Sequence, residues 1–171
     1  MKHLQHLTLL FIVSLFSLAA QAQVTIPEDD LIGTWTYKLT EGANADITLT
    51  FKGDNSVHQN TAVNVAQIGG TINIDFDGTW VTAGDSITLN IDVNSAKVKY
   101  KGSNAQMGAM IEQQFNANRE ALMESMGSGG NVTVLRHVVV ADQILCFDQE
   151  VPSPKGDGTK KEMKIVMNRK K

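Results

Sequence analysis

The stretch Gly33-Thr34-Trp35-Thr36-Tyr37-Lys38-Leu39 alternates apolar and polar residues one for one, and its first tripeptide recurs at 78–80, where it opens a second alternating stretch. Alternation with a period of two places every second side chain on the same face of a β-strand, so one face is buried and the other is solvated. Antiparallel sheets commonly have this one-sided burial, whereas parallel sheets are buried on both faces. The sequence therefore predicts an all-β protein built as an antiparallel meander.

Similar alternating segments continue along the chain, separated by short runs of Gly, Asp and Asn that are typical of turns. We expect strands near 34–39, 47–51, 57–65, 72–76, 87–93, 98–100, 132–140, 144–148 and 163–167. Many short strands of this kind are typical of a sandwich or a barrel. We predict an up-and-down β-barrel of about eight strands.

The two ends of the chain carry opposite charges. Residues 28–30 are acidic, whereas the last strand and its flanks include Lys160, Lys161 and Arg169. One interpretation is that the last strand pairs with the first, so that opposite charges meet where the barrel closes. The alternative is an open sheet whose lysine-rich edge strand resists aggregation.

Between Gln106 and Met126 the apolar residues recur at intervals of three, four and seven, which indicates an amphipathic helix inserted before the last strands. Ser103 followed by Gln106 has the form of a capping box, and Gly127 is a natural helix stop. Methionine is frequent at adaptable binding surfaces, so the helix could cover the mouth of the barrel. The alternative is that it packs on the outside. The methionines concerned are Met107, Met110, Met123 and Met126.

Residues 1–22 have the pattern of a secretory signal peptide. Lys2 precedes an apolar run at 7–18, and Ala20-Gln21-Ala22 is a small-x-small cleavage site. The alternative is a transmembrane anchor, but the run is shorter than the roughly 20 apolar residues that a bilayer requires. We therefore expect residues 23–171 to form one domain that is soluble after cleavage and either periplasmic or secreted.

Composition narrows the classes of partner. The formal net charge is −3, and loss of Lys2 with the signal peptide makes it −4, which argues against nucleic acid or an anionic membrane surface as the main partner. Cys146 is the only cysteine, so the chain cannot form an internal disulfide. Its apolar neighbours favour a buried thiol over a nucleophile.

No segment has the spacing of a catalytic or metal-binding motif. His58 and His137 each stand alone in a strand, and we expect them to face solvent. Asp75-Phe76-Asp77-Gly78 has few of the acidic ligands of a calcium loop, so we expect a strand with outward carboxylates. The glycines at 127–130 follow the helix and offer no helix N-terminus to a phosphate. We expect no enzyme activity, no cofactor and no metal.

Two sequences, LIGTWTYKL at 31–39 and GTWVTAGDSITLNI at 78–91, are similar to those of bacterial lipocalin-like domains of the calycin group. The resemblance implies that Trp35 fills the closed end of a barrel and that an arginine from late in the chain stacks on it. Arg169 is the first candidate for this arginine and Arg136 the second. The Thr-Asp-Tyr type of turn found in mid-chain in classical lipocalins is absent.

We therefore expect an exported, lipocalin-like domain that binds a small hydrophobic ligand and has no chemistry of its own. The alternative is a protein-interaction or inhibitor module of the cell envelope, with an envelope protein as partner and a filled barrel. Trp35 and Trp80 would then be plain core residues. The residues expected to bind the ligand are Trp35, Tyr37, Phe51, Phe76, Trp80, Tyr100, Met107, Met110 and Ile111.

Overall fold

The computed structural model describes residues 25–40, 44–121, 132–152 and 159–171. The predicted signal peptide at 1–22 lies outside the described residues. So do the predicted C-terminal part of the helix, with Met123, Met126 and Gly127, and the loop at 153–158.

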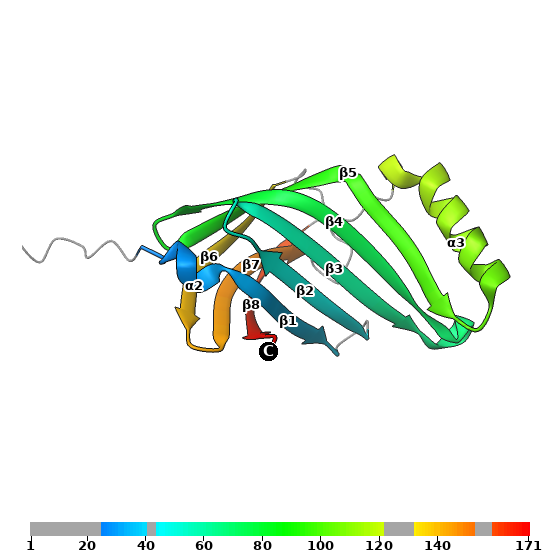
Figure 1. Cartoon of the computed structure of the whole chain (residues 1–171), viewed down its shortest axis with the longest axis horizontal. Helices are drawn as coiled ribbons and strands as arrows, with labels where there is room; N and C mark the ends of the chain where they lie inside the picture. Colours follow the sequence, from blue (N-terminus) through cyan, green and yellow to red (C-terminus); the bar gives the residue numbers. More distant parts are fainter. Residues whose placement is uncertain (1–24, 41–43, 122–131, 153–158) are drawn as a thin grey trace, which may run out of the picture.

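Eight antiparallel strands form one closed barrel in which each strand pairs with its neighbours in the sequence (Figure 1). The strands are β1 (Gly33–Leu39), β2 (Ala45–Phe51), β3 (Ser56–Val65), β4 (Gly70–Ala83), β5 (Ser86–Gly102), β6 (Val132–Ala141), β7 (Ile144–Pro152) and β8 (Lys160–Arg169). The predicted all-β, up-and-down barrel of about eight strands is confirmed. Its strands form because their inward positions are apolar and their outward positions polar.

The helical segments among the described residues include α2 (Glu28–Leu31), the short 3₁₀ turn η1 (Ala66–Ile68) and α3 (Ala105–Ala117). The position of α3, between β5 and β6, confirms a helix before the last three strands. The predicted capping box is wrong. The N-cap is Asn104, whose side chain accepts a hydrogen bond of 3.1 Å from the Met107 backbone N–H. Asparagine is among the strongest N-cap residues, so the helix begins one residue later than a cap at Ser103 would place it.

Strands β4 and β5 are longer than the alternation predicted. The segments expected at 87–93 and 98–100 belong to one strand, because a bulge in β5 accommodates the residues between them that break the alternation. Asp75 of β4 pairs with Lys97, whereas Asp77 pairs with Asp92. The Ser95 hydroxyl fixes this bulge by accepting a 2.7 Å hydrogen bond from the Asp77 backbone N–H.

Strand β8 pairs with β1, which confirms the predicted closure. The pairing consists of Trp35 with Arg169 and Thr36 with Asn168, whereas β1 pairs with β2 along its whole length. The predicted meeting of opposite charges is not found at this seam. Arg169 donates instead to the backbone carbonyls of Asp30 and Ile32. The first and last strands are therefore joined near one end of the barrel only.

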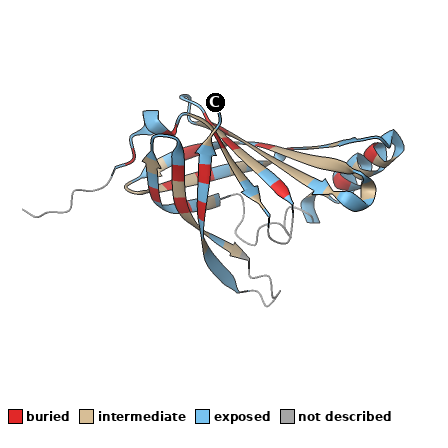
Figure 2. Ribbon diagram, turned by 90° about the horizontal axis from the view of Figure 1, so that it is seen from below, coloured by how far each residue is buried: buried red, intermediate tan, exposed pale blue. Residues whose placement is uncertain are grey.

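The beginning of β4 and the end of β5 extend together beyond the barrel, and α3 lies against this extension (Figure 1). On its β5 side, strand β6 pairs only with the beginning of β5, at Ile87 to Asn90. Helix α3 packs on the extension through Phe115, which joins Phe76 and Ala96 in a small buried cluster. The main core lies inside the barrel, and Figure 2 shows its buried residues as bands across the strands.

A candidate ligand cavity inside the barrel

The closed end of the barrel is built around Trp35. Its side chain is fully buried, and its indole N–H donates a 2.8 Å hydrogen bond to the carbonyl of Leu31 in α2. The Arg169 guanidinium carbon lies 4.3 Å from the centroid of the Trp35 ring, within cation–π range. The predicted stacking of Arg169 on Trp35 is confirmed. The second candidate, Arg136, instead pairs with Glu150 at 3.0 Å.

Gly33 allows Arg169 to approach this close. Its backbone φ is +139°, a conformation that residues with a Cβ rarely adopt. A Cβ at this position would lie 3.0 Å from Arg169 Nη1. Gly33 therefore serves both the backbone turn before Trp35 and the arginine that covers the ring.

The tryptophan of the second Gly-Thr-Trp copy lies in the same core, and its indole N–H also donates to a backbone carbonyl. Trp80 meets Phe51 edge to face, with ring centroids 5.6 Å apart, and its indole N–H donates to the Lys52 carbonyl at 3.3 Å. A Cβ on Gly78 would lie 2.4 Å from the Asn90 carbonyl oxygen, so the backbones of β4 and β5 require glycine there. Both tryptophans are buried core residues.

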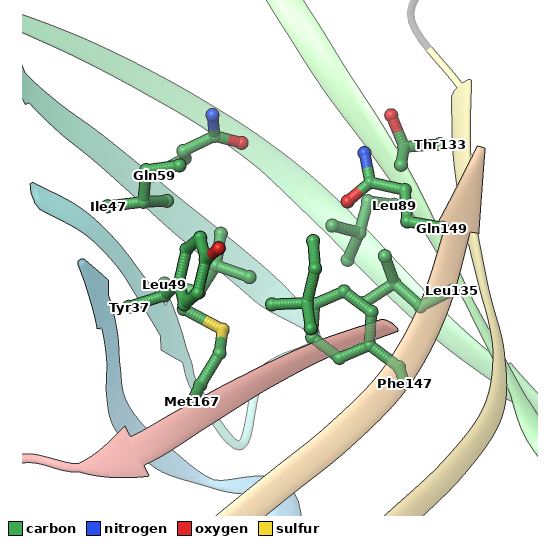
Figure 3. Close-up of a pocket in the computed structure, with 11 residues that line it drawn as sticks. Tyr37, Ile47, Leu49, Gln59, Leu89, Thr133, Leu135, Phe147, Gln149 and Met167 are labelled. Atoms are coloured by element: carbon green, nitrogen blue, oxygen red, sulfur yellow. The ribbon is translucent and has the colours of Figure 1, made fainter. Parts of the chain in front are cut away.

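Next to this packed layer lies a cavity of about 240 Å³ inside the barrel (Figure 3). Every strand except β4 contributes residues whose side chains alternate inward. The lining residues are Tyr37, Ile47, Leu49, Gln59, Leu89, Thr133, Leu135, Phe147, Gln149, Ile165 and Met167.

The cavity lining separates into an apolar and a polar part. In Figure 3 the amides of Gln59 and Gln149 and the hydroxyl of Thr133 lie towards the top of the view, above Phe147 and Met167. None of the described residues that line the cavity carries a charged side chain. The arrangement can bind an apolar group and offer neutral hydrogen bonds beside it.

Of the nine residues expected to bind a ligand, only Tyr37 lines this cavity. Trp35, Phe51 and Trp80 form the packed layer at the closed end, and Phe76 lies in the small cluster under α3. The aromatic residues were predicted to line the site because they are apolar. Large rings, however, bury the most area when they fill the core itself.

The remaining predicted residues belong to the extension and its helix. The Tyr100 hydroxyl donates to the Ile68 carbonyl at 2.8 Å, and its ring lies against Gly108 of α3. Met107 and Ile111 are half-buried on α3, while Met110 is 46% exposed. No residue of α3 is among those that line the barrel cavity. The described part of the helix thus agrees with packing on the outside of the barrel.

A second cavity of about 230 Å³ lies between β5 and α3. Arg119, one of its lining residues, donates to the backbone carbonyls of Asn94 and Ala96 and lies 5.9 Å from the Phe115 ring centroid. These contacts hold the end of the helix to the bulged part of β5. Arg119 is thus engaged in structural contacts.

The two histidines lie on the outer surface, as expected, but strand pairing gives each an acidic partner that the sequence did not show. His58 Nδ1 lies 2.8 Å from Asp77 Oδ1, and its Nε2 lies 3.4 Å from Asp75 Oδ1. The hydrogen bond with His58 holds the pKa of Asp77 below its ordinary value. His137 Nδ1 lies 3.0 Å from Asp148 Oδ2. The 75–78 segment is part of β4, as predicted, and not a calcium loop.

Among the described residues, His137, Asp148 and Glu162 place one ligand atom each within 4.8 Å of one another. They come from β6, β7 and β8, and His137 and Glu162 are exposed. Exposed acidic groups commonly gather without an ion, so we assign the cluster no metal. Cys146, on the outer surface of β7, is half-buried and not the buried thiol that was predicted.

Comparison with known proteins finds no family model and no curated protein that matches the chain. Within the described residues, no helix has the length and apolar character needed to cross a membrane.

Proposed function

We propose that the protein is an exported, lipocalin-like carrier that binds a small apolar ligand inside its barrel and performs no catalysis. The single observation that supports this proposal most is the cavity of about 240 Å³ above the Trp35 layer. A barrel of eight strands has room for side chains or for one small ligand. In this barrel the side chains leave space at Tyr37, Ile47 and Phe147. An engineered apolar cavity of about 150 Å³ is already large enough to hold benzene.

Binding can be measured with the uncharged fluorescent probe N-phenyl-naphthylamine. We expect one probe molecule per chain, with fluorescence enhanced by transfer to an apolar site. Ile47→Trp would fill the cavity and reduce probe affinity at least about tenfold, equivalent to about 1.4 kcal/mol. Val81→Trp is the matched control, because Val81 is 50% exposed on the outer face of β4. Equal binding by both variants would place the probe outside the barrel and contradict the proposal.

The natural ligand can be sought by native mass spectrometry of the protein taken from its own compartment without detergent. An additional mass that organic solvent releases would identify the ligand directly. The same spectrum tests export. Cleavage after Ala22 predicts a mature chain beginning at Gln23.

A second candidate function is a protein-interaction module of the cell envelope. It is favoured by apolar side chains on the outer face of β6, β7 and β8, where Val139, Ile144 and Val166 are exposed beside the half-buried Cys146. Exposed apolar groups that adjoin one another can mark a protein contact. If an envelope protein binds this face, Val139→Asp should abolish its co-purification, whereas Val81→Asp on β4 should not. Unchanged co-purification would count against this candidate.

A further inference from the structure

We infer that the cavity selects an uncharged amphiphile, with a short apolar tail and a neutral head group that both donates and accepts hydrogen bonds. This inference rests on the proposed function, because it names the class of ligand that the barrel cavity takes. Alcohols and primary amides belong to the class. Carboxylates and ammonium ions do not.

The first argument comes from the layering of the cavity. Gln59, Thr133 and Gln149 each lie two residues along a strand from a buried apolar residue that points to the same side. Those neighbours are Val57, Leu135 and Phe147. Pairing in the barrel confirms the orientation, because Gln59 is opposite Leu49, Thr133 opposite Leu89 and Gln149 opposite Met163. A polar layer therefore lies next to the apolar layer, further from the closed end.

The second argument concerns hydrogen bonding. Within the described residues, the side chains of Gln59, Thr133 and Gln149 make no hydrogen bond to another group, and all three are half-buried. A glutamine amide has two donor hydrogens and an acceptor oxygen, and a threonine hydroxyl both donates and accepts. A ligand that displaces water from these three side chains leaves them without a partner unless its own head group supplies one, so a head group that forms these hydrogen bonds gains affinity. A hydroxyl or amide head group can bond to both kinds of atom.

The third argument is the absence of charge. The described lining residues include no Lys, Arg, His, Asp or Glu. Arg169, at the closed end, lies against the Trp35 ring and donates to the carbonyls of Asp30 and Ile32. A carboxylate or ammonium transferred to the cavity would lose hydration without gaining an opposite charge. A charged ligand is therefore excluded from the cavity even where its shape would fit.

Size restricts the tail. The volume of about 240 Å³ lies above the roughly 150 Å³ that holds benzene and below the roughly 300 Å³ at which sites for drug-sized molecules begin. A medium-length chain or a single ring fits these limits better than a long acyl chain. Octyl compounds are therefore suitable probes.

The test is displacement of N-phenyl-naphthylamine from the mature protein by octanol, octanamide, octanoate at pH 8 and octylammonium. We expect octanol and octanamide to displace the probe at concentrations at least about tenfold lower than the two ions. Gln59→Leu and Gln149→Leu should still bind the probe but should lose about fivefold or more of their affinity for octanol. Asn60→Leu, on the outward face beside Gln59, is the control and should preserve the preference.

The outcomes separate this inference from the proposed function. If octanoate competes as well as octanol, or if no octyl compound displaces a probe that Ile47→Trp does exclude, the inference fails and apolar binding stands. A preference for octanol that survives Gln59→Leu and Gln149→Leu would also overturn it. If the wild-type protein does not bind the probe, or binds it equally after Ile47→Trp, the proposed function fails as well.

Discussion

Arg169, at the end of the last strand, stacks on Trp35, near the start of the first, with 4.3 Å between its guanidinium carbon and the ring centroid. The two residues are also paired in the β1–β8 register. The guanidinium group donates to the carbonyls of Asp30 and Ile32 as well, so one side chain joins the first strand, the last strand and the segment that precedes β1. A cation over a tryptophan face, together with charged hydrogen bonds, is a strong local arrangement.

Replacement of Arg169 by alanine should lower the free energy of unfolding by about 2–4 kcal/mol, because it removes a cation–π contact and two charged hydrogen bonds together. Arg169→Lys keeps the charge but not the planar fork, so it should recover less than half of the loss. Urea denaturation followed by tryptophan fluorescence measures both. Full recovery by lysine would show that charge alone matters, contrary to the geometry.

Gly33→Ala should cost about 1–3 kcal/mol of stability, because alanine must adopt a φ of +139° and its Cβ would lie 3.0 Å from Arg169 Nη1. Gly53→Ala is the control. A Cβ there meets only the Ile32 side chain at 3.5 Å, an ordinary contact, and so the control should change stability little. Similar losses in the two variants would remove the special role assigned to Gly33.

The period of the apolar pattern was sufficient to predict the antiparallel strands and the position of the helix. Closure was predicted from the opposite charges of the two chain ends, and the strands do pair, but the charges do not meet at the β1–β8 seam, where Arg169 donates to backbone carbonyls. The bulge in β5 could not be predicted, since it depends on the Ser95 hydroxyl meeting the Asp77 backbone across the sheet. For the same reason, the acidic partners of His58 and His137 appear only once the strands are in register.

The cavity was harder to predict than the fold. The nine expected site residues were chosen for apolar size, and most of the largest fill the core. The signal for the polar layer was present in the sequence, because Gln59 falls at an inward position of the alternating series that begins at Val57. A polar residue at an inward position indicates either a partner or a ligand. Gln149 carried the same signal two residues after Phe147.

Substitutions at Trp80 and Tyr37 can distinguish a core residue from a residue that lines the cavity. Trp80 is buried against Phe51 and does not line the cavity, whereas Tyr37 does. Trp80→Ala should therefore cost about 3–5 kcal/mol. Trp80→Phe, a milder change, should leave the affinity for N-phenyl-naphthylamine within about twofold. Tyr37→Ala should instead change the affinity more than Trp80→Phe does. A larger affinity change in Trp80→Phe than in Tyr37→Ala would place the ligand against the tryptophan.

Acid sensitivity should depend on the outer-face pair of His58 and Asp77. The hydrogen bond with His58, the largest influence, lowers the pKa of Asp77 from its ordinary value of 3.8. The folded state therefore favours the carboxylate more than the unfolded state does. This stabilisation is present above pH 3.8 and is lost as the pH falls through the lowered pKa. The Asp77 side chain is 60% exposed, so the effect should be small.

The measurement is the urea midpoint of the wild-type protein and of Asp77→Asn between pH 6 and pH 2. The variant should be slightly less stable at pH 6. The difference should shrink as the pH falls below 3.8 and should approach zero once the pH has fallen through the lowered pKa of Asp77, because the wild-type carboxyl is then protonated in both states. Asp46→Asn, on the outward side of β2, controls for the loss of one negative charge. A difference that stays constant down to pH 2 would mean that the His58–Asp77 contact contributes nothing that depends on ionisation.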